Sequence, residues 1–436
     1  MLDIKYIIEN KDEVQNSIKE RHVECDLDGV IALYEAQNKI KTEVEALRAE
    51  ANANATAMKS AKDQTEREPL IKKGGELKAK IAELSAEEEE AIAKFKEAMM
   101  TVPNTLAPDA PAGRDDTENE VVSTFMEPTQ FDFTPKDHLE IGKDLDLIDF
   151  EAGAKVTGSK FYFLKNEAVL LEMGIKNLAM RMAMEKGFAP MITPDLARNS
   201  ILEGIGFAPR GDESNTYELK DLDMSLIATA EIPAGGYHAN EIIDADQLPI
   251  KYVADSHCFR REAGSSGQSS KGMYRVHQFS KIELFVFCLP EQSARMHEEI
   301  RDLEESIYQA LKIPYQVVNV CAGDLGASAY KKYDIEAWMP GKDDGGAYGE
   351  VTSASNCTSF QARRLNIRYK NPETGKNEFV HTLNGTAAAL SRTPVAILEN
   401  YQTADGDVII PEVLRPFMGI DKITRDKSQL SKAKAA

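Results

Sequence analysis

The chain has 436 residues, of which 52 are basic and 72 acidic, so its formal net charge is -20. Hydrophobic residues make up 42% and charged residues 28%, which excludes a disordered or collagen-like chain. The charged N-terminus and the lack of any long apolar run predict a cytoplasmic protein with no membrane partner. No CxxC pair occurs, so we expect neither a disulfide framework nor structural zinc among Cys25, Cys258, Cys288, Cys321 and Cys357.

The clearest periodic pattern covers residues 30–102. Two runs alternate spacings of three and four, which is a heptad seam typical of coiled-coil helices. The polar segment 51–69 between them, which ends at Pro69, is expected to form the turn of an antiparallel hairpin. Glu88 falls on the second seam, where either a polar layer or a drift in register explains it. The seam residues are Val30, Leu33, Gln37, Ile40, Val44, Leu47 and Ala51, then Leu77, Ile81, Leu84, Glu88, Ala91, Phe95, Ala98 and Val102.

The charge is unevenly distributed along this hairpin. Residues 39–80 hold ten basic against seven acidic side chains, a balance of +3, which leaves -23 for the rest. A basic segment on an acidic protein is typical of a site for a phosphate backbone. A solvated helix face, a spacer or a dimerisation coiled coil explains the pattern as well. The basic residues are Lys39, Lys41, Arg48, Lys59, Lys62, Arg67, Lys72, Lys73, Lys78 and Lys80.

We predict three regions: an N-terminal domain over 1–102 with its arm at about 30–100, a linker over 103–135, and a large domain over 136–436. The segment 103–135 is rich in Pro, Gly, Asp and Asn, so it is a linker or an extended entry strand. Beyond it, amphipathic helices at about 162–186 and 291–312 alternate with strand-like runs at 250–259, 280–288 and 314–320. This alternation predicts an α+β domain built on a mostly antiparallel sheet.

Four segments concentrate arginine, carboxylate and hydroxyl side chains: 229–231, 258–287, 349–364 and 382–402. The sequence has no P-loop, no dinucleotide fingerprint, no HExxH and no GxSxG. Because side chains alternate along a strand, Arg275, Phe279 and Glu283 can share one face. Arginine suits phosphate oxygens, acidic pairs can hold Mg²⁺ at those phosphates, and a phenylalanine can stack on a base.

These segments resemble class II aminoacyl-tRNA synthetases and, within them, the seryl-tRNA synthetase family. The resemblance rests on GFAPMITP (187–194), TAE (229–231), FRREAG followed by RVHQFSKIE (259–283), and the segment ending at Arg392. VPN (102–104), YDIEAWMPG (333–341) and SNCTSFQARR (355–364) match as well. It implies an antiparallel catalytic sheet flanked by helices, preceded by a two-helix coiled-coil arm, in a homodimer.

The resemblance also implies an activity. The enzyme would activate L-serine with ATP and Mg²⁺ to seryl-adenylate, and transfer serine to the 3′-terminal ribose of tRNA(Ser), and of tRNA(Sec) where that tRNA is present. The arm would bind tRNA through eight of its basic residues: Lys39, Lys41, Arg48, Lys59, Lys62, Arg67, Lys72 and Lys73. Two alternatives stay open: a ligase that passes an adenylated amino acid to a carrier protein, and a non-catalytic paralogue.

Roles at the site are implied by the same resemblance. Arg260 would grip the α-phosphate of ATP, while Arg275 and Arg392 would hold the outer phosphates, and these three are the implied catalytic residues. Phe279 would stack on adenine, and Glu350 with Ser353 would bind Mg²⁺. Serine would be bound by Thr229, Ala230, Glu231, Glu283 and Thr386. ATP would contact Arg260, Arg261, Glu262, Arg275, Phe279, Glu350, Val351, Thr352, Ser353 and Arg392.

The sequence departs from the bacterial family pattern at two places. Where that pattern reads NGSGLAVGRT, this chain reads NGTAAALSRT, so Thr386 keeps a hydroxyl but adds a methyl group to the implied serine pocket. Gln268 and Lys271 replace two arginines of the family loop, which weakens any bidentate contact from that loop to phosphate or base.

Overall fold

The structure is a computed structural model that describes residues 1–207, 215–262 and 272–427. Gln268 and Lys271 therefore lie outside the described residues. The chain forms two compact units, Met1–Thr105 and Leu106–Ala436. Within the described ranges, no helix has the length and apolar character needed to cross a membrane.

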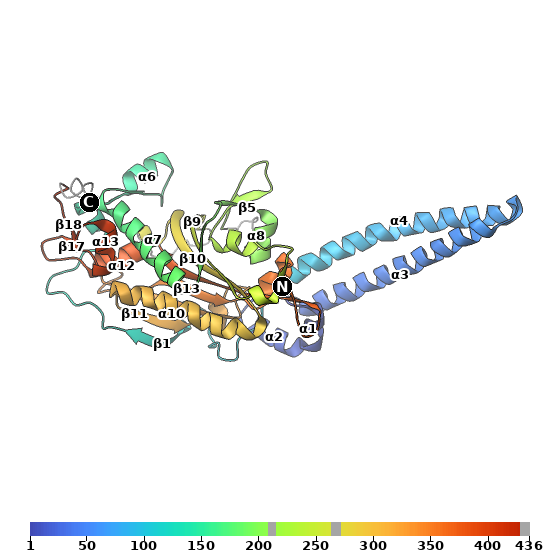
Figure 1. Ribbon diagram of the computed structural model, residues 1–436, viewed down its shortest axis with the longest axis horizontal. Coiled ribbons are helices and arrows are strands. Elements are labelled where there is room, and N and C mark those ends of the chain that lie inside the picture. Colours follow the sequence, from blue (N-terminus) through green and yellow to red (C-terminus); the bar gives the residue numbers. More distant parts are fainter. Residues whose placement is uncertain (208–214, 263–271, 428–436) are drawn as a thin grey trace. The chain divides into compact units, whose positions relative to one another are not determined.

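The N-terminal unit consists of helices. The short α1 (Ile4–Glu9) and α2 (Lys11–Glu20) precede the long α3 (Leu27–Ser60) and α4 (Gln64–Thr101), which lie side by side (Figure 1). Asp26 begins α3 by accepting a hydrogen bond from the backbone N–H of Gly29 at 2.9 Å. At the base of the hairpin, α1, α2 and both long helices share an apolar core of Ile7, Val14, Ile18, Leu27, Val30, Met99 and Val102.

The predicted seam is confirmed, but the predicted turn is wrong. Every seam position is buried or half-buried, including Glu88. The heptad register therefore does not drift at Glu88, which is a polar residue within the seam. The helices continue through most of 51–69, and only 61–63 separate them. The seam also continues, with Asn54 buried and donating its Nδ2 to the Leu70 carbonyl at 2.9 Å. Asn54 and Gly74 occupy the next seam positions but have no large apolar side chain, so the heptad pattern cannot be recognised there in the sequence.

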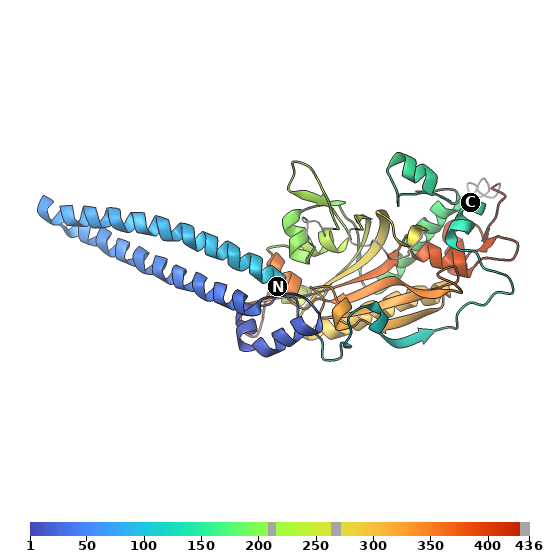
Figure 2. The ribbon, with the colours of Figure 1, turned by 180° about the vertical axis from the view of Figure 1, so that it is seen from behind.

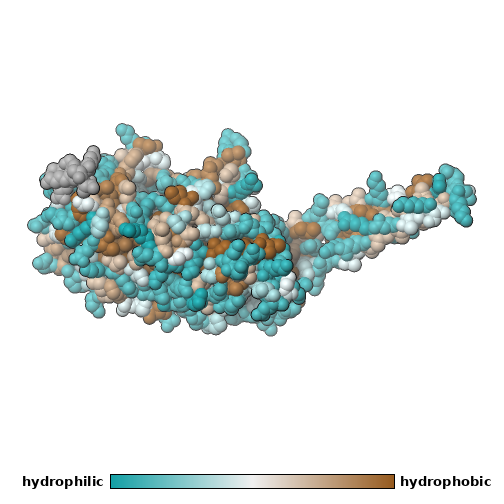
Figure 3. Space-filling model, viewed as in Figure 1, coloured by the Kyte–Doolittle hydropathy of each residue, from teal (hydrophilic) through white to brown (hydrophobic). Residues whose placement is uncertain are grey.

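The turn is closed by side-chain caps. Asp63 accepts a hydrogen bond from the Glu66 N–H at 3.0 Å, and Glu66 accepts one from the Lys62 N–H at 2.8 Å. Pro69 lies inside α4, although a proline there removes one helical hydrogen bond. The far end of the hairpin is hydrophilic (Figure 3).

The second unit is built on an eight-stranded sheet, which confirms the predicted α+β class. Neighbouring strands are antiparallel, except that β4 runs parallel to β9. The strand β1 lies within the region predicted as a linker or entry strand, and it forms one edge of the sheet. In sheet order the strands are β1 (Glu120–Phe125), β11 (Tyr315–Asn319), β12 (Lys331–Met339), β13 (Ala347–Asn356), β16 (His381–Ala389), β10 (Gln278–Cys288), β9 (Ile250–Phe259) and β4 (Ala189–Ile192).

Helices α7 (Glu167–Glu185), α10 (Ser293–Leu311) and α12 (Thr393–Asn400) cover one face of the sheet (Figures 1 and 2). Alternation along β10 divides its side chains between the two faces. Ile282, Leu284, Val286 and Cys288 join the core under these helices. Phe285 and Phe287 join a second core on the other face, with α8 (Asn199–Ile205), α9 (Glu231–Gly236) and α11 (Phe360–Leu365).

Shorter elements complete this unit. Three strands form the small sheet β5-β7-β6, and three others form β15-β14-β8. The remaining helices are α5 (His138–Asp144), α6 (Phe150–Val156) and α13 (Arg415–Met418). The remaining strands are β2 (Ile148–Asp149), β3 (Phe163–Leu164), β5 (Leu196–Arg198), β6 (Tyr217–Glu218), β7 (Met224–Leu226), β8 (Ile242–Asp244), β14 (Arg368–Lys370), β15 (Asn377–Phe379), β17 (Val408–Ile409) and β18 (Lys422–Ile423).

Candidate active site

A cavity of about 380 Å³ opens over strands β10, β13 and β16, on the face opposite α10. Most of the residues that the resemblance implied line it. They are Thr229, Glu231, Arg260, Glu262, Arg275, Phe279, Glu283, Glu350, Val351, Thr352, Ser353, Thr386 and Arg392. As expected, Arg275, Phe279 and Glu283 face one cavity, although Arg275 precedes the strand that carries the other two.

Two implied residues do not line the cavity. Ala230 is fully buried beside the start of α9, so its side chain packs in the core. Arg261 is exposed and its backbone N–H donates to the Asn215 carbonyl at 2.9 Å. Because neighbouring side chains of an extended chain point to opposite sides, Arg260 enters the cavity and Arg261 does not.

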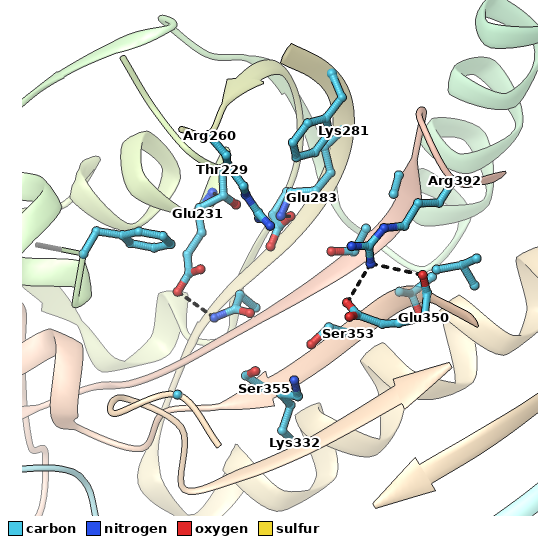
Figure 4. A pocket seen from close by; sticks show the side chains of 18 of the residues that line it. Thr229, Glu231, Arg260, Lys281, Glu283, Lys332, Glu350, Ser353, Ser355 and Arg392 are labelled. Carbon is cyan, nitrogen blue, oxygen red and sulfur yellow. Dashed lines mark hydrogen bonds and ion pairs between the residues drawn. The ribbon is translucent and has the colours of Figure 1, made fainter. Parts of the chain in front are cut away.

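One end of the cavity is acidic (Figure 4). Glu231, the first residue of α9, accepts hydrogen bonds from Gln361 Nε2 and Asn384 Nδ2, both at 2.7 Å. Burial, and then the neighbouring Glu283, raise the pKa of Glu231 to about 7. Burial also raises the pKa of Glu283, against the attraction of its ion-pair partner Lys281. Two carboxylates so placed can receive an ammonium group, which would restore the ionised form of both.

Arginines line the rest of the cavity, and Arg260 lies beside Glu283 (Figure 4). Arg260 donates its Nε to the Ala228 carbonyl at 3.2 Å, and its guanidinium carbon lies 5.3 Å from the centre of the Phe279 ring. Arg275 donates to the Glu262 carboxylate. Each guanidinium is therefore held in a fixed plane by a partner at Nε. The N–H groups on its Nη atoms lie in the same plane. That arrangement suits oxygens of a bound phosphate.

Arg392 and Glu350 form an ion pair on the far side of the cavity from Glu231 (Figure 4). Nη1 of Arg392 lies 3.1 Å from both the carbonyl oxygen and a carboxylate oxygen of Glu350. Burial alone would raise the pKa of Glu350, but Arg392 and then Lys332 outweigh it and lower that pKa. Glu350 is thus ionised at neutral pH, with the Ser353 hydroxyl on the same wall.

Glu350 and Ser353 offer the hard oxygen ligands that Mg²⁺ prefers. Among the described residues, no group of three or more His, Cys, Asp or Glu side chains could hold a metal ion. Mg²⁺ commonly binds through one or two protein ligands together with phosphates of the substrate. This donor set therefore fits an ion that enters with a nucleotide.

The cavity also contains residues that sequence reasoning missed. Lys281 lies between Phe279 and Glu283 on the same face of β10, so the alternation that selected those two also points to it. Asn384 precedes Thr386 by two residues on β16, and the same rule applies. Lys332 also lines the cavity, and its Nζ lies 3.0 Å from Oδ2 of Asp334. In the sequence, the sign of this ion pair is a lysine two residues before an aspartate on one strand.

Two β-bulges shape the floor of the cavity. In β13, Ile335 of β12 pairs with Thr352 and Glu336 pairs with Glu350, so Val351 is the extra residue. In β16, Ala387 is extra in the same way, between the partners of Ile282 and Glu283. A bulge changes the direction of neighbouring side chains, and bulges are common next to active sites.

Comparisons with known proteins match both units. The family model "Seryl-tRNA synthetase N-terminal domain" matches residues 1–106, and "tRNA synthetase class II core domain (G, H, P, S and T)" matches 216–401. The chain is 53% identical over 423 residues to "Serine--tRNA ligase" of Treponema denticola, which covers 97% of this chain and 100% of that protein.

Solved structures agree with these matches. The seryl-tRNA synthetase of Pyrococcus horikoshii, complexed with ATP, is 40% identical with a TM-score of 0.88, over 97% of this chain and 99% of that one. The cytoplasmic serine-tRNA ligase of Naegleria fowleri, in complex with AMP, is 32% identical with a TM-score of 0.83 and the same coverage. Family models, full-length relatives and solved structures thus all match the same family. The chain belongs to the seryl-tRNA synthetase family of class II aminoacyl-tRNA synthetases.

Proposed function

We propose that this protein activates L-serine with ATP and transfers it to tRNA(Ser), and to tRNA(Sec) where that tRNA is present. The observation that carries the proposal is one cavity that holds two groups of side chains: the carboxylates of Glu231 and Glu283 at one end, and the arginines Arg260, Arg275 and Arg392, which extend from Arg260 beside Glu283 to Arg392 on the far side (Figure 4). The first suits the ammonium group of an amino acid, and the second suits the phosphates of ATP. A cytoplasmic location follows from these substrates.

In the first step the serine carboxylate attacks the α-phosphorus of ATP. A bond forms between carboxylate oxygen and phosphorus, the bond to the bridging oxygen breaks, and pyrophosphate leaves. The carboxylate is already ionised at neutral pH, so no general base is needed. Arg260 faces the charge that develops at the α-phosphate, while Arg275 and Arg392 hold the β- and γ-phosphates, and catalysis rests on this positioning and neutralisation.

The ionised Glu350 and the Ser353 hydroxyl would hold Mg²⁺ at the phosphates. Bound there, the ion would neutralise phosphate charge beyond what the arginines supply. Arg392 positions Glu350 for this task through its contacts with both the carbonyl and the carboxylate of that residue.

In the second step a hydroxyl of the 3′-terminal ribose of tRNA attacks the activated carbonyl carbon. An ester bond forms, the bond between carbonyl carbon and phosphate oxygen breaks, and AMP leaves. Phe279 holds the adenine of the adenylate by stacking. The arginines that stabilised the adenylate then stabilise the charge of the departing phosphate.

Serine is selected by polar groups and by space. Thr229, Glu283 and Thr386 place hydroxyl and carboxylate oxygens at the acidic end, so alanine would leave buried polar groups unpaired. Sites built to bind a substrate hydroxyl reject the analogue that lacks it by about 10⁴–10⁵-fold. Threonine is excluded by volume, and the extra methyl group of Thr386 contributes to that exclusion.

The arm is proposed to bind tRNA by its shape and charge, as proteins generally bind double-stranded RNA. All eight basic residues assigned to tRNA are exposed. Lys73 pairs with Glu50 at 2.8 Å, and the distal half of the hairpin keeps its positive balance. The N-terminal family match over residues 1–106 does not favour a ligase that acts on a carrier protein.

Reversing the charge at the tip of the arm should separate the two steps. With Lys59, Lys62 and Lys72 changed to Glu, the KM for tRNA should rise by about 10²-fold, because several phosphate contacts are lost. Serine-dependent ATP–pyrophosphate exchange should stay at the wild-type rate. The matched control changes Lys94 and Lys96 near the base of the arm to Glu. Equal loss in both variants, or loss of exchange, would contradict a tRNA role for the tip.

We infer a homodimer from an exposed apolar surface next to the sheet edge. Ile192 on edge strand β4 is 84% exposed, and Met173 and Met184 on α7 are 55% and 50% exposed. Val169, at 42%, lies one turn from Met173 on the same face of the helix. Apolar side chains gathered at the edge strand and an adjacent helix are typical of an interface.

Changing Ile192 to Asp should convert the dimer to a monomer, because it buries a charge in the apolar interface. The molar mass is measured by light scattering across a dilution series. Ile71→Asp is the matched control, since Ile71 is 55% exposed on the arm and should leave the mass unchanged. A wild-type monomer at micromolar concentration would refute the inferred dimer.

The direct test of the proposed function is ATP–pyrophosphate exchange with serine as the added amino acid. Exchange that depends on serine supports the proposed function. If no amino acid tested supports exchange, a non-catalytic paralogue would be favoured.

A further inference from the structure

Glu304 is a carboxyl side chain buried directly beneath the floor of the cavity. It lies on α10, on the face of the sheet opposite the substrates, and its exposed fraction is 0%. Oε2 accepts a hydrogen bond from the Thr352 hydroxyl of β13 at 2.8 Å. On the β16 side, a Cβ added to Gly385 would lie 2.3 Å from Ile300 Cγ2 and 2.5 Å from Oε1 of Glu304, so glycine leaves room for both of these α10 side chains.

The carboxyl occupies the place where two strands separate. Strands β13 and β16 pair from Asn356/Leu383 to Ala354/Gly385, and no pairing follows beyond that point in the described chain. Both bulges begin within three residues of the separation, at Val351 and Ala387. Backbone groups that leave a ladder need other partners when they are buried. Glu304 sits below this fork, in reach of both strands.

The electrostatics of Glu304 agree with a role at the fork. Burial raises its pKa well above the usual value, while the Thr352 hydroxyl and the backbone N–H of Thr386 act in the opposite direction. Oε1 makes no hydrogen bond of normal geometry among the described residues. A carboxyl group has two oxygens that can each accept a hydrogen bond, so one can face the Thr352 hydroxyl of β13 and the other the Thr386 N–H of β16.

We propose that Glu304 is a positioning residue for both ends of the site, holding the separated ends of β13 and β16 at the spacing that substrates require. The proposal rests on the proposed function. On β16 the next residue after Gly385 is Thr386, which faces serine. On β13 the neighbours of Thr352 include Ser353, which faces the nucleotide. Glu304 touches no substrate and acts through these strands.

The α10 helix presents other polar side chains to the sheet, and their hydrogen-bond partners differ from those of Glu304. His297 lies 2.9 Å from the Ala354 carbonyl, within the paired part of the strands. Tyr308 bonds to the Thr393 hydroxyl of α12 at 2.9 Å. Glu304 alone of these three reaches the fork, so its removal should alter the site more than it alters the fold.

The test replaces Glu304 by Leu and by Gln. Leucine fills a similar volume without the polar contacts, and it leaves the buried Thr352 hydroxyl without its partner. Glutamine keeps an acceptor at one end and a donor at the other. Leu303→Ala is the matched control, since Leu303 is the 1% exposed neighbour on α10 and its truncation leaves a cavity away from the fork.

Glu304→Leu should raise the KM for serine by about tenfold and the KM for ATP several-fold, the scale of one lost hydrogen bond at each end. The preference for serine over threonine in exchange should fall by a similar factor. The thermal midpoint should fall as well, because the Thr352 hydroxyl loses its partner. Glu304→Gln should stay within about twofold of wild type, while Leu303→Ala should lower the midpoint and leave both KM values unchanged.

Wild-type KM values and selectivity in Glu304→Leu would overturn the proposal. If that variant fails to fold, Thr352→Val provides the second test, because it removes the partner hydroxyl and should by itself raise the KM for ATP. An unchanged KM there would overturn the proposal as well. Failure of the proposed function would look different, because the wild-type protein itself would then show no exchange with serine.

Discussion

Replacing Arg260 by alanine is expected to reduce serine-dependent ATP–pyrophosphate exchange by about 10²–10³-fold, the usual effect of removing one group that stabilises developing charge. Arg260 lies against Phe279 and is fixed through Nε by the Ala228 carbonyl, so its guanidinium faces the centre of the cavity. The thermal midpoint should change little, since this side chain makes no apolar core. The loss should appear in kcat, because the charge on the α-phosphate grows in the transition state.

Arg261 provides the matched control for this prediction. It has the same chemistry and the next position in the chain, but it is exposed and does not line the cavity. Arg261→Ala should therefore exchange at nearly the wild-type rate. Equal losses in the two variants would mean that the geometry of the cavity does not determine which arginine acts on ATP.

The KM for serine is expected to rise as the pH falls below about 7 and to be flat above it. In the empty site, burial and Glu283 raise the pKa of Glu231 to about 7. The serine ammonium binds the ionised carboxylate, so protonation of Glu231 competes with serine. Well below that pKa the KM should rise by about tenfold for each pH unit, because one proton must be lost for each serine bound.

The pH profile has an internal control and a variant control. The KM for ATP should stay nearly constant over the same range, because Arg260, Arg275 and Arg392 keep their charge. Glu231→Gln should raise the KM for serine and remove the part of its pH dependence that comes from Glu231, since Gln361 and Asn384 would then surround a group that does not titrate. A wild-type profile that is flat down to about pH 5.5 would contradict the assignment of Glu231 to the ammonium group.

The sequence predicts the parts of this fold that depend on periodicity. The alternation along 278–288 places Phe279 and Glu283 on one face, and the structure confirms it. The heptad seam predicts the hairpin for the same reason. The turn of the hairpin was misplaced because Asn54 and Gly74 occupy seam positions without apolar side chains, and a polar residue satisfied by a backbone carbonyl leaves no hydrophobic signal.

The site required information that a linear pattern does not carry. Ala230 and Arg261 sit beside cavity residues in sequence, yet the helix start and the extended chain turn their side chains away. The bulges at Val351 and Ala387 break the simple alternation of β13 and β16. The only sign of Glu304 in the sequence is a carboxylate next to Leu303, on the apolar face of an amphipathic helix. Its partners come from strands far away in the chain.

Serine is the amino acid that this cavity is proposed to activate. The most direct measurement is ATP–pyrophosphate exchange by the full-length protein with serine, threonine, alanine and glycine in parallel, each over a range of concentrations. We predict efficient exchange with serine and a kcat/KM for alanine lower by about 10⁴-fold, because alanine leaves the hydroxyl-binding groups unpaired. Exchange that is as efficient with threonine or alanine as with serine, or absent with all four, would contradict the account.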